Sequence, residues 1–317
     1  MWRQANYSGS KDQQVACVYA GYLSFKDKDM DSLFFMYLTN GIVMGIIFAL
    51  SALGVSLIVG IMNVINFAHG ELYILAGYLS YILSIKVGVP FYFAIPITIL
   101  LIFIIGILIE RSLIKPTYGN VMYSLIITFI LSIVIQNFAL LVFGPFPNKP
   151  PNWVFGSTNI FELFRYGNQR IVSCIVAIGI ITGVLLLIKK TWFGKTVRAV
   201  SQDRETASIM GIDTSKVNML SFGLGCALAG AAGVVLSPIF PVTPLAGIEI
   251  SLIAFVILVI GGMGSLWGCI IGGLVIGIVQ SLGAAYISSG YKDIFGFIIL
   301  ILVLFMRPAG LFGRKAL

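Results

Sequence analysis

Long apolar runs alternate with short polar gaps along most of this chain. A helix that crosses a bilayer needs about 20 mostly apolar residues, and the runs are close to that length. They lie at 36–61, 72–85, 91–109, 121–143, 171–188, 217–237, 250–267, 270–287 and 294–306. The pattern predicts an all-α polytopic membrane protein, a bundle of about 8–9 transmembrane helices that fills residues 34–317.

Two of these runs leave the number of spans open. The run at 72–85 is short for a straight span, so it is either a half-helix or it includes part of 66–71. The glycine-rich stretch GGMGSLWGCIIG at 261–272 predicts either a tight turn or a re-entrant segment.

Composition supports a membrane protein. Hydrophobic residues make up 59% of the 317 residues and charged residues 10%, whereas soluble domains carry about 25% charged residues. The net charge of +8 does not indicate nucleic-acid binding, because the basic residues stand in the gaps between apolar runs. The chain also has 35 glycines, and small residues at 223–233 and 272–277 predict closely packed helix faces.

The segment at 1–33 is mixed and polar, and it does not have the pattern of a signal peptide. Met30 and Met36 stand just before the first apolar run. Either a start codon assigned too early or a genuine polar tail explains this segment.

The distribution of Lys and Arg predicts the orientation, because cytoplasmic loops are enriched in these residues. With nine spans, the gaps at 110–120 and 189–216 and the tail after 306 fall on one side and contain eleven Lys and Arg. The gaps on the other side contain five. We therefore expect the C-terminus in the cytoplasm.

One polar constellation lies between the first two apolar runs and comprises Asn63, Asn66, His69 and Glu71. Ionisable groups at membrane depth are costly and mark a pathway or a structural pair. The spacing of Asn63, Asn66 and Gly70 would place them on one face if the segment is helical. These side chains either line a translocation path or stand at the cytoplasmic interface, where His69 and Glu71 meet water or cap a helix. A lone histidine without a nearby cysteine does not indicate a metal site, and no cofactor is expected.

A second constellation occupies the charged loop at 192–222. The stretch from Arg198 to Met210 has helical character, Gly211 would end that helix, and Asp213 would cap the next one. A short amphipathic helix between spans either docks a partner or serves as a solvated connector. The segment E-T-A-S-I-M-G at 205–211 resembles the E-A-A-x-x-x-G pattern of the coupling loop in ABC importer permeases, with Thr206 in place of the first alanine.

Enzyme chemistry is not indicated. The triplet at 194–196 resembles the end of a P-loop, but Lys189 stands where the motif needs its first glycine. The single histidine is also far from any strained serine elbow, so the sequence contains no nucleophile and base pair.

Four segments together resemble the branched-chain amino-acid ABC permease family, LivH type. They are ALGVSLIVGIMNVINFAHGELYILAGY at 52–78, RAVSQDRETASIMGID at 198–213, GGMGSLWG at 261–268 and RPAGLFG at 307–313. They occur in the family's order and are spread from about residue 36 to the C-terminus. Residues 1–33 lie outside the family pattern.

The resemblance implies a prokaryotic inner-membrane subunit, embedded in lipid, that pairs with a second, related permease. Two cytoplasmic ATP-binding subunits would dock on the coupling loops, and an external binding protein would deliver leucine, isoleucine or valine. It implies coupling roles for Glu205, Ala207 and Gly211, with Arg198 and Asp203 in support. It also favours a path role for Asn63, Asn66, His69 and Glu71.

Other readings remain open at this point. Urea and short amides are cargoes of similar permeases. A gradient-driven carrier would favour carboxylates buried in mid-span, yet Glu71, Glu110 and Glu249 all fall near span ends. A passive channel would have no need of a coupling loop.

Overall fold

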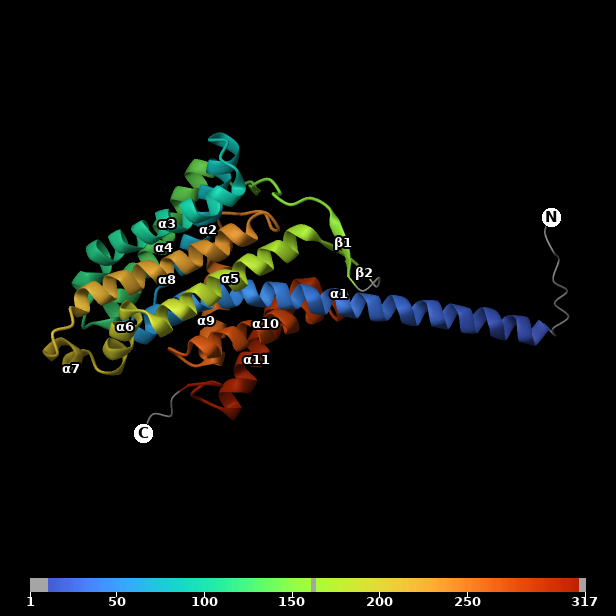
Figure 1. Cartoon of the computed structure of the whole chain (residues 1–317). Coiled ribbons are helices and arrows are strands. Elements are labelled where there is room, and N and C mark those ends of the chain that lie inside the picture. Colours follow the sequence, from blue (N-terminus) through green and yellow to red (C-terminus); the bar gives the residue numbers. More distant parts are fainter. Residues whose placement is uncertain (1–10, 161–163, 314–317) are drawn as a thin grey trace.

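The computed structural model describes the backbone of residues 11–160 and 164–313, and the side chains of 32–159 and 165–313. Helices form most of this part of the chain (Figure 1). In chain order they are α1 (Lys11–Met62), α2 (His69–Tyr81), α3 (Phe91–Ile109), α4 (Val121–Phe143), α5 (Asn168–Lys190), α6 (Trp192–Gln202), α7 (Arg204–Ile209), α8 (Thr214–Leu236), α9 (Ala246–Gly261), α10 (Leu266–Tyr286) and α11 (Lys292–Met306). Short π-helical turns extend α2 (Ile82–Lys86) and α3 (Glu110–Ile114), and 3-10 turns occur at Lys115–Thr117 and Ser289–Tyr291.

Each of the nine predicted apolar runs is mostly helical, so the all-α polytopic fold is confirmed. Among the described residues, seven helices are long and apolar enough to cross a membrane: α1, α3, α4, α5, α8, α10 and α11 with the short turns that adjoin them. Helix α9 is apolar but shorter, and α2 is a 13-residue helix prolonged by its π-helical turn.

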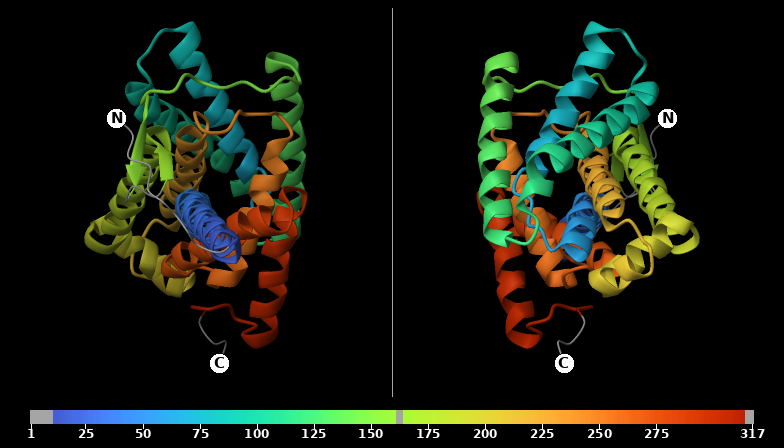
Figure 2. Two further views of the ribbon diagram at one scale, coloured as in Figure 1. Left: turned by 90° about the vertical axis from the view of Figure 1, so that its right-hand side faces the viewer. Right: turned by 90° about the vertical axis from the view of Figure 1, so that its left-hand side faces the viewer.

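Helices α1 and α8 form the centre of the bundle, as the views along α1 in Figure 2 show. Close approach depends on glycine where these helices meet their neighbours. A Cβ added at Gly45 would lie 2.8 Å from the carbonyl oxygen of Gly273, and one added at Gly225 would lie 2.7 Å from that of Gly54. The closely packed faces predicted at 223–233 and 272–277 are thereby confirmed.

The outer helices expose apolar side chains. Leu141 on α4 is 86% exposed and Phe305 on α11 is 90% exposed. Since an exposed surface of this kind is stable only in an apolar solvent, these faces fit contact with lipid.

The segment at 261–272 is a tight turn followed by the start of a helix. Helix α9 ends at Gly261 and α10 begins at Leu266, so the expected boundaries of 267 and 270 were wrong by several residues. Gly262 and Gly264 have φ values of +95° and +79°, a region that favours glycine. The turn packs on the end of the chain, where Leu311 N donates to Ile260 O at 2.8 Å.

A two-stranded antiparallel hairpin lies at the opposite end of the bundle from α6 and α7 (Figure 1). Its strands are β1 (Ser157–Ile160) and β2 (Phe164–Gly167), and the apolar pattern did not predict them. The expectation for residues 1–33 stays a prediction: residues 1–10 lie outside the described part of the chain, and from Lys11 the backbone is helical.

Candidate functional site

The loop between α5 and α8 contains two helices rather than the single helix expected over 198–210. Helix α6 ends at Gln202, and Asp203 has extended backbone angles before α7 begins. The Asp203 carboxylate accepts hydrogen bonds from Glu205 N at 2.9 Å and Thr206 N at 3.0 Å. Asp203 therefore divides the expected helix, because its side chain caps the second half.

Gly211 and Asp213 act as the sequence predicts. Gly211 follows α7 with a φ of +86°, the left-handed conformation typical of a glycine after a helix. The Asp213 carboxylate accepts from Lys216 N at 3.0 Å and caps α8. The loop thus has defined backbone geometry at both ends of α7.

Two of the expected coupling residues hold the loop against the bundle. The Arg198 guanidinium donates to Ile188 O near the carboxyl end of α5, and Ala207 is buried. Arg204 stacks its guanidinium 5.1 Å from the ring centre of Tyr118. These contacts fix the loop to α5 and to the segment that follows α3.

Other side chains of α7 and of the residue that follows it face outward. Glu205 is exposed, and Ile209 and Met210 are 85% and 76% exposed. An exposed apolar pair beside a carboxylate at the tip of a short, fixed helix is suited to contact with another protein.

The polar constellation near the start of α2 is buried. Asn66, His69 and Glu71 are each at most 1% exposed, so the alternative in which His69 and Glu71 meet water is wrong for this structure. Among the described residues, His69 Nε2 lies 3.0 Å from Ser51 O, and Glu71 Oε1 accepts from Ser132 Oγ at 3.4 Å. The other polar atoms, Asn66 Nδ2, His69 Nδ1 and Glu71 Oε2, have no hydrogen-bond partner there.

Asn63 does not join this buried group. Helix α1 ends at Met62, and residues 63–68 are not helical, so the condition for a shared helical face is not met. Asn63 is exposed and has a φ of +52°, while the Asn66 carboxamide accepts from Ala68 N at 3.1 Å. The local bond made by Asn66 competes with helix formation, and the chain reverses before α2.

Helix α9 closes over the buried group. Gly70 N donates to Ser251 Oγ at 2.8 Å, and Ser251 Oγ donates to Phe67 O at 3.2 Å. The Glu71 carboxyl lies against Gly247, in the first turn of α9, where a Cβ would collide with it. A carboxyl group at this place meets the positive end of the helix dipole.

Comparison with known proteins decides the family. Residues 37–304 match the model of the family described as branched-chain amino acid transport system / permease component. The chain belongs to this family. The likeness to its LivH-type members found in the sequence is thereby confirmed.

Several relatives align over nearly their whole length. The chain is 33% identical to the high-affinity branched-chain amino acid transport system permease protein LivH of Escherichia coli K12, over 89% of this chain and 96% of that protein. It is 32% identical to the corresponding protein BraD of Pseudomonas aeruginosa, over 87% and 95%. A chain of PsaBC from Streptococcus pneumoniae in complex with Fab shares the fold, with a TM-score of 0.50 at 14% identity over 87% and 94%.

In this member of the branched-chain permease family, the sequence did not reveal all the residues of the loop around α7 and of the buried polar group at the start of α2. The sequence did not predict that Ile209 is exposed, because an apolar residue in a charged helical segment is assigned to the buried face of the helix. Ser251 and Gly247 were missed because they contact α2 from about 180 positions further along the chain. Small residues on both sides, Gly70 on α2 and Ala246, Gly247 and Ser251 on α9, were the available signals of a close approach.

The cap at Asp203 leads to a testable prediction. The hydrogen bond from the Thr206 hydroxyl, followed by that from its backbone N–H, lowers the pKa of the Asp203 carboxyl below its usual value. We expect Asp203→Ala to speed amide exchange in α7, because the first-turn N–H groups lose their acceptor. Asp203→Asn keeps an acceptor oxygen and should protect these amides.

Hydrogen–deuterium exchange of a peptide that covers residues 203–211 measures this effect. Since the folded-state pKa is lowered, the contribution of the charged cap is present above the usual carboxyl pKa and is lost as the pH falls through the lower, folded value. Equal exchange in the Ala variant and the wild type would contradict the cap.

Proposed function

We propose that this chain is the membrane-spanning permease subunit of an ATP-driven importer of branched-chain amino acids, namely leucine, isoleucine and valine. The observation that carries the proposal is the family match over residues 37–304, together with near full-length relatives that are branched-chain amino acid permeases. The seven long apolar helices support a multi-pass protein of the inner membrane. The excess of Lys and Arg in the loops on one side supports a cytoplasmic C-terminus.

The coupling role belongs to the loop around α7. Glu205 and Gly211, with the exposed Ile209 and Met210, form the surface that contacts a cytoplasmic ATP-binding subunit. Arg198 and Ala207 hold that surface to the bundle, and Asp203 fixes the first turn of α7. When the ATP-binding subunit displaces this rigid element, α5 and α8, which directly flank the loop, move with it.

The full importer contains further subunits in this proposal. A second, homologous permease pairs with this chain, two ATP-binding subunits dock from the cytoplasm, and an external binding protein delivers the cargo. This chain has no P-loop of its own, so ATP is hydrolysed in the partners.

A reconstitution tests the function. The tagged chain is purified in mild detergent with the proteins that accompany it, which are identified by mass spectrometry and placed in vesicles. We expect two P-loop ATPases and a second permease, and ATP-dependent uptake of labelled leucine when the binding protein is added outside. Vesicles that contain all these subunits and take up no leucine, isoleucine or valine would refute the proposed cargo. A chain that purifies without any ATPase would refute the ABC assignment.

The buried group at the start of α2 serves the translocation path in this proposal. Asn66, His69 and Glu71 each keep a polar atom without a partner among the described residues. Buried polar atoms in native proteins are usually paired, so unpaired ones call for an explanation. A path that admits water or cargo when α9 moves provides one. Asn63, exposed at the end of α1, would stand at the mouth of that path.

Glu71→Gln tests this role. The change keeps the shape of the side chain and the bond from Ser132 but removes the ionisable group. The amide cannot ionise, so it cannot make a charged hydrogen bond within the path. Such bonds contribute about 1.5–3 kcal/mol, and we therefore expect leucine uptake to fall about tenfold or more with the amount of folded protein unchanged. Equal losses of uptake and of folded protein would mean that Glu71 only holds α2 against α9.

A further inference from the structure

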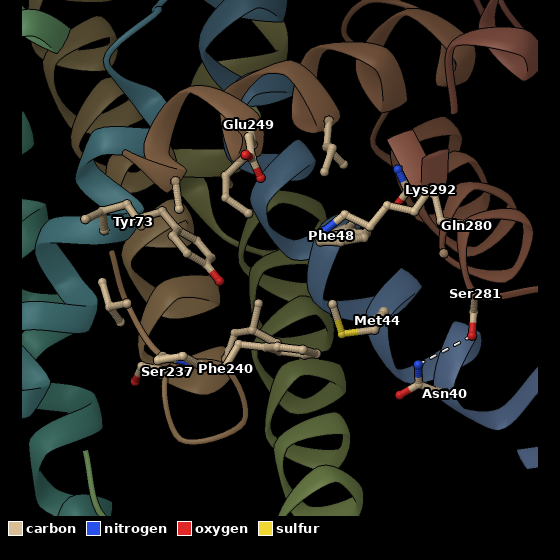
Figure 3. Close-up of a pocket in the computed structure, with 18 of the residues that line it drawn as sticks. Asn40, Met44, Phe48, Tyr73, Ser237, Phe240, Glu249, Gln280, Ser281 and Lys292 are labelled. Carbon is tan, nitrogen blue, oxygen red and sulfur yellow. Dashed lines mark hydrogen bonds between the residues drawn. The ribbon is translucent and has the colours of Figure 1, made fainter. Parts of the chain in front are cut away.

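A cavity of about 340 Å³ lies between α1, α2, α8, α9 and α10 and extends to the first residue of α11. Pockets that bind small molecules occupy roughly 300–1,000 Å³, so the cavity is large enough for a single amino acid. Figure 3 shows side chains from these helices converging on it. Neither the coupling loop nor the buried group at the start of α2 uses it.

Two opposite charges line this cavity from different helices. Glu249 lies on α9 and Lys292 begins α11. In Figure 3 the Lys292 side chain reaches across the cavity toward Phe48, and Glu249 lies on another wall. The ion pair found among the described residues joins Lys216 and Asp213, so Glu249 and Lys292 do not neutralise each other directly.

The rest of the lining is mostly apolar, with a few amide and hydroxyl groups. Met44, Phe48 and Ile253 provide apolar surface. Ser281 and Asn40 line it as well, and Asn40 Nδ2 donates to Ser281 Oγ at 3.4 Å. The cavity therefore combines a carboxylate, an ammonium group and an apolar surface within one small volume.

We propose that this cavity binds a zwitterionic α-amino acid with a branched aliphatic side chain. Lys292 pairs with the carboxylate of the ligand, Glu249 pairs with its ammonium group, and Met44, Phe48 and Ile253 receive the side chain. Glu249 and Lys292 are both exposed to solvent, so a zwitterion can form charge-assisted hydrogen bonds with both, a singly charged ligand with only one, and a neutral ligand with neither. The proposal rests on the proposed function, since it assigns the cargo of that function to a site in this chain.

The position of the cavity is suited to movement of a bound ligand toward the buried polar group at the start of α2. Tyr73 of α2 and Ala246 of α9 line the cavity. Two residues before Tyr73, Glu71 lies against Gly247, the neighbour of Ala246. A ligand in the cavity therefore stands beside the α2–α9 contact that has to open for passage.

Calorimetry on the purified complete complex, without the external binding protein, tests the site with three probes. Leucine carries both charges, leucinamide lacks the carboxylate, and 4-methylpentanoate lacks the amine. In Lys292→Gln we expect leucine to bind about tenfold more weakly and leucinamide to bind as it does to the wild type. In Glu249→Gln we expect the same loss for leucine, with 4-methylpentanoate unchanged. Lys149→Gln is the matched control, because Lys149 is exposed and does not line the cavity, and it should bind all three probes as the wild type does.

The outcomes separate this site from the proposed function. Wild-type complex that binds no leucine, variants that bind leucine as the wild type does, or an equal loss for all three probes would each overturn the site. If vesicles import leucine with ATP and these variants show no change, only the site is wrong. If the variants change the binding of the three probes as expected but the vesicles import no leucine, the proposed function is wrong and the binding site is still supported.

Discussion

Gly211→Arg is expected to abolish uptake while the protein stays folded in the membrane. Gly211 lies two residues after the end of α7 and has a φ of +86°, and a Cβ added there would have nothing within 4 Å. The new side chain would therefore project from the surface that we assign to the ATP-binding subunit. A bulky positive charge at the centre of a docking surface blocks contact more strongly than it disturbs the fold, because close packing is what such surfaces need.

Gly88→Arg is the matched control for this experiment. Gly88 also has a positive φ, +78°, and open space around its Cβ position, but it lies between α2 and α3 on the predicted outer side. A left-handed conformation costs a residue other than glycine about 1–2 kcal/mol, and this cost is common to both variants. A difference in uptake between the two variants therefore results from the position of the new arginine and not from backbone strain.

The measurements are leucine uptake into vesicles and the amount of ATPase that co-purifies with each variant. We expect Gly88→Arg to retain both and Gly211→Arg to lose both at equal membrane levels of the chain. Normal uptake by Gly211→Arg would show that this loop is not the coupling element.

The apolar runs predicted the helices because length and hydropathy are local properties of the chain. A run such as 121–143 has only one stable form in lipid, since every backbone group has to be hydrogen-bonded within the segment. Helix α4 has these same bounds. Where the boundary depends on one side chain, the pattern failed: Val200 and Ala207 fit a single helix, but the Asp203 cap divides it.

The buried polar group could be found from sequence, but its environment could not. Asn66, His69 and Glu71 stand out as polar residues between apolar runs. Whether they meet water depends on Ser132 and Ser251, which come from α4 and α9. No periodicity within 60–77 encodes those contacts. The same holds for the cavity, whose two charges are brought together by α9 and α11.

Gly70→Ala is expected to destabilise the protein strongly, because it separates α2 from α9. A Cβ at position 70 would lie 2.6 Å from Ser251 Oγ and closer still to the carbonyl oxygen of Gly247. The hydroxyl can turn away, but the carbonyl belongs to the backbone of α9 and can move only if the helix moves. Overpacking a well-packed contact costs roughly 1–3 kcal/mol and occasionally more.

Gly179→Ala on α5 is the control, since a Cβ there would meet nothing within 4 Å. Alanine is favoured over glycine in a helix by about 1 kcal/mol, so this variant should be as stable as the wild type or slightly more stable. Thermal unfolding of the purified complex in detergent compares the two variants, and an unchanged melting temperature for Gly70→Ala would contradict the close approach.

The double variant Gly70→Ala, Ser251→Ala separates the side-chain collision from the backbone collisions. Removing the Ser251 hydroxyl relieves the side-chain collision but leaves those with the Gly247 carbonyl and the Ser251 backbone nitrogen. It also removes the hydrogen bonds to Gly70 N and Phe67 O, so we expect at most a partial recovery of the melting temperature. Helix α2 carries Glu71 toward the buried group and Tyr73 toward the cavity. A shift of α2 away from α9 would therefore disturb both, and uptake should fall by more than the loss of folded protein accounts for.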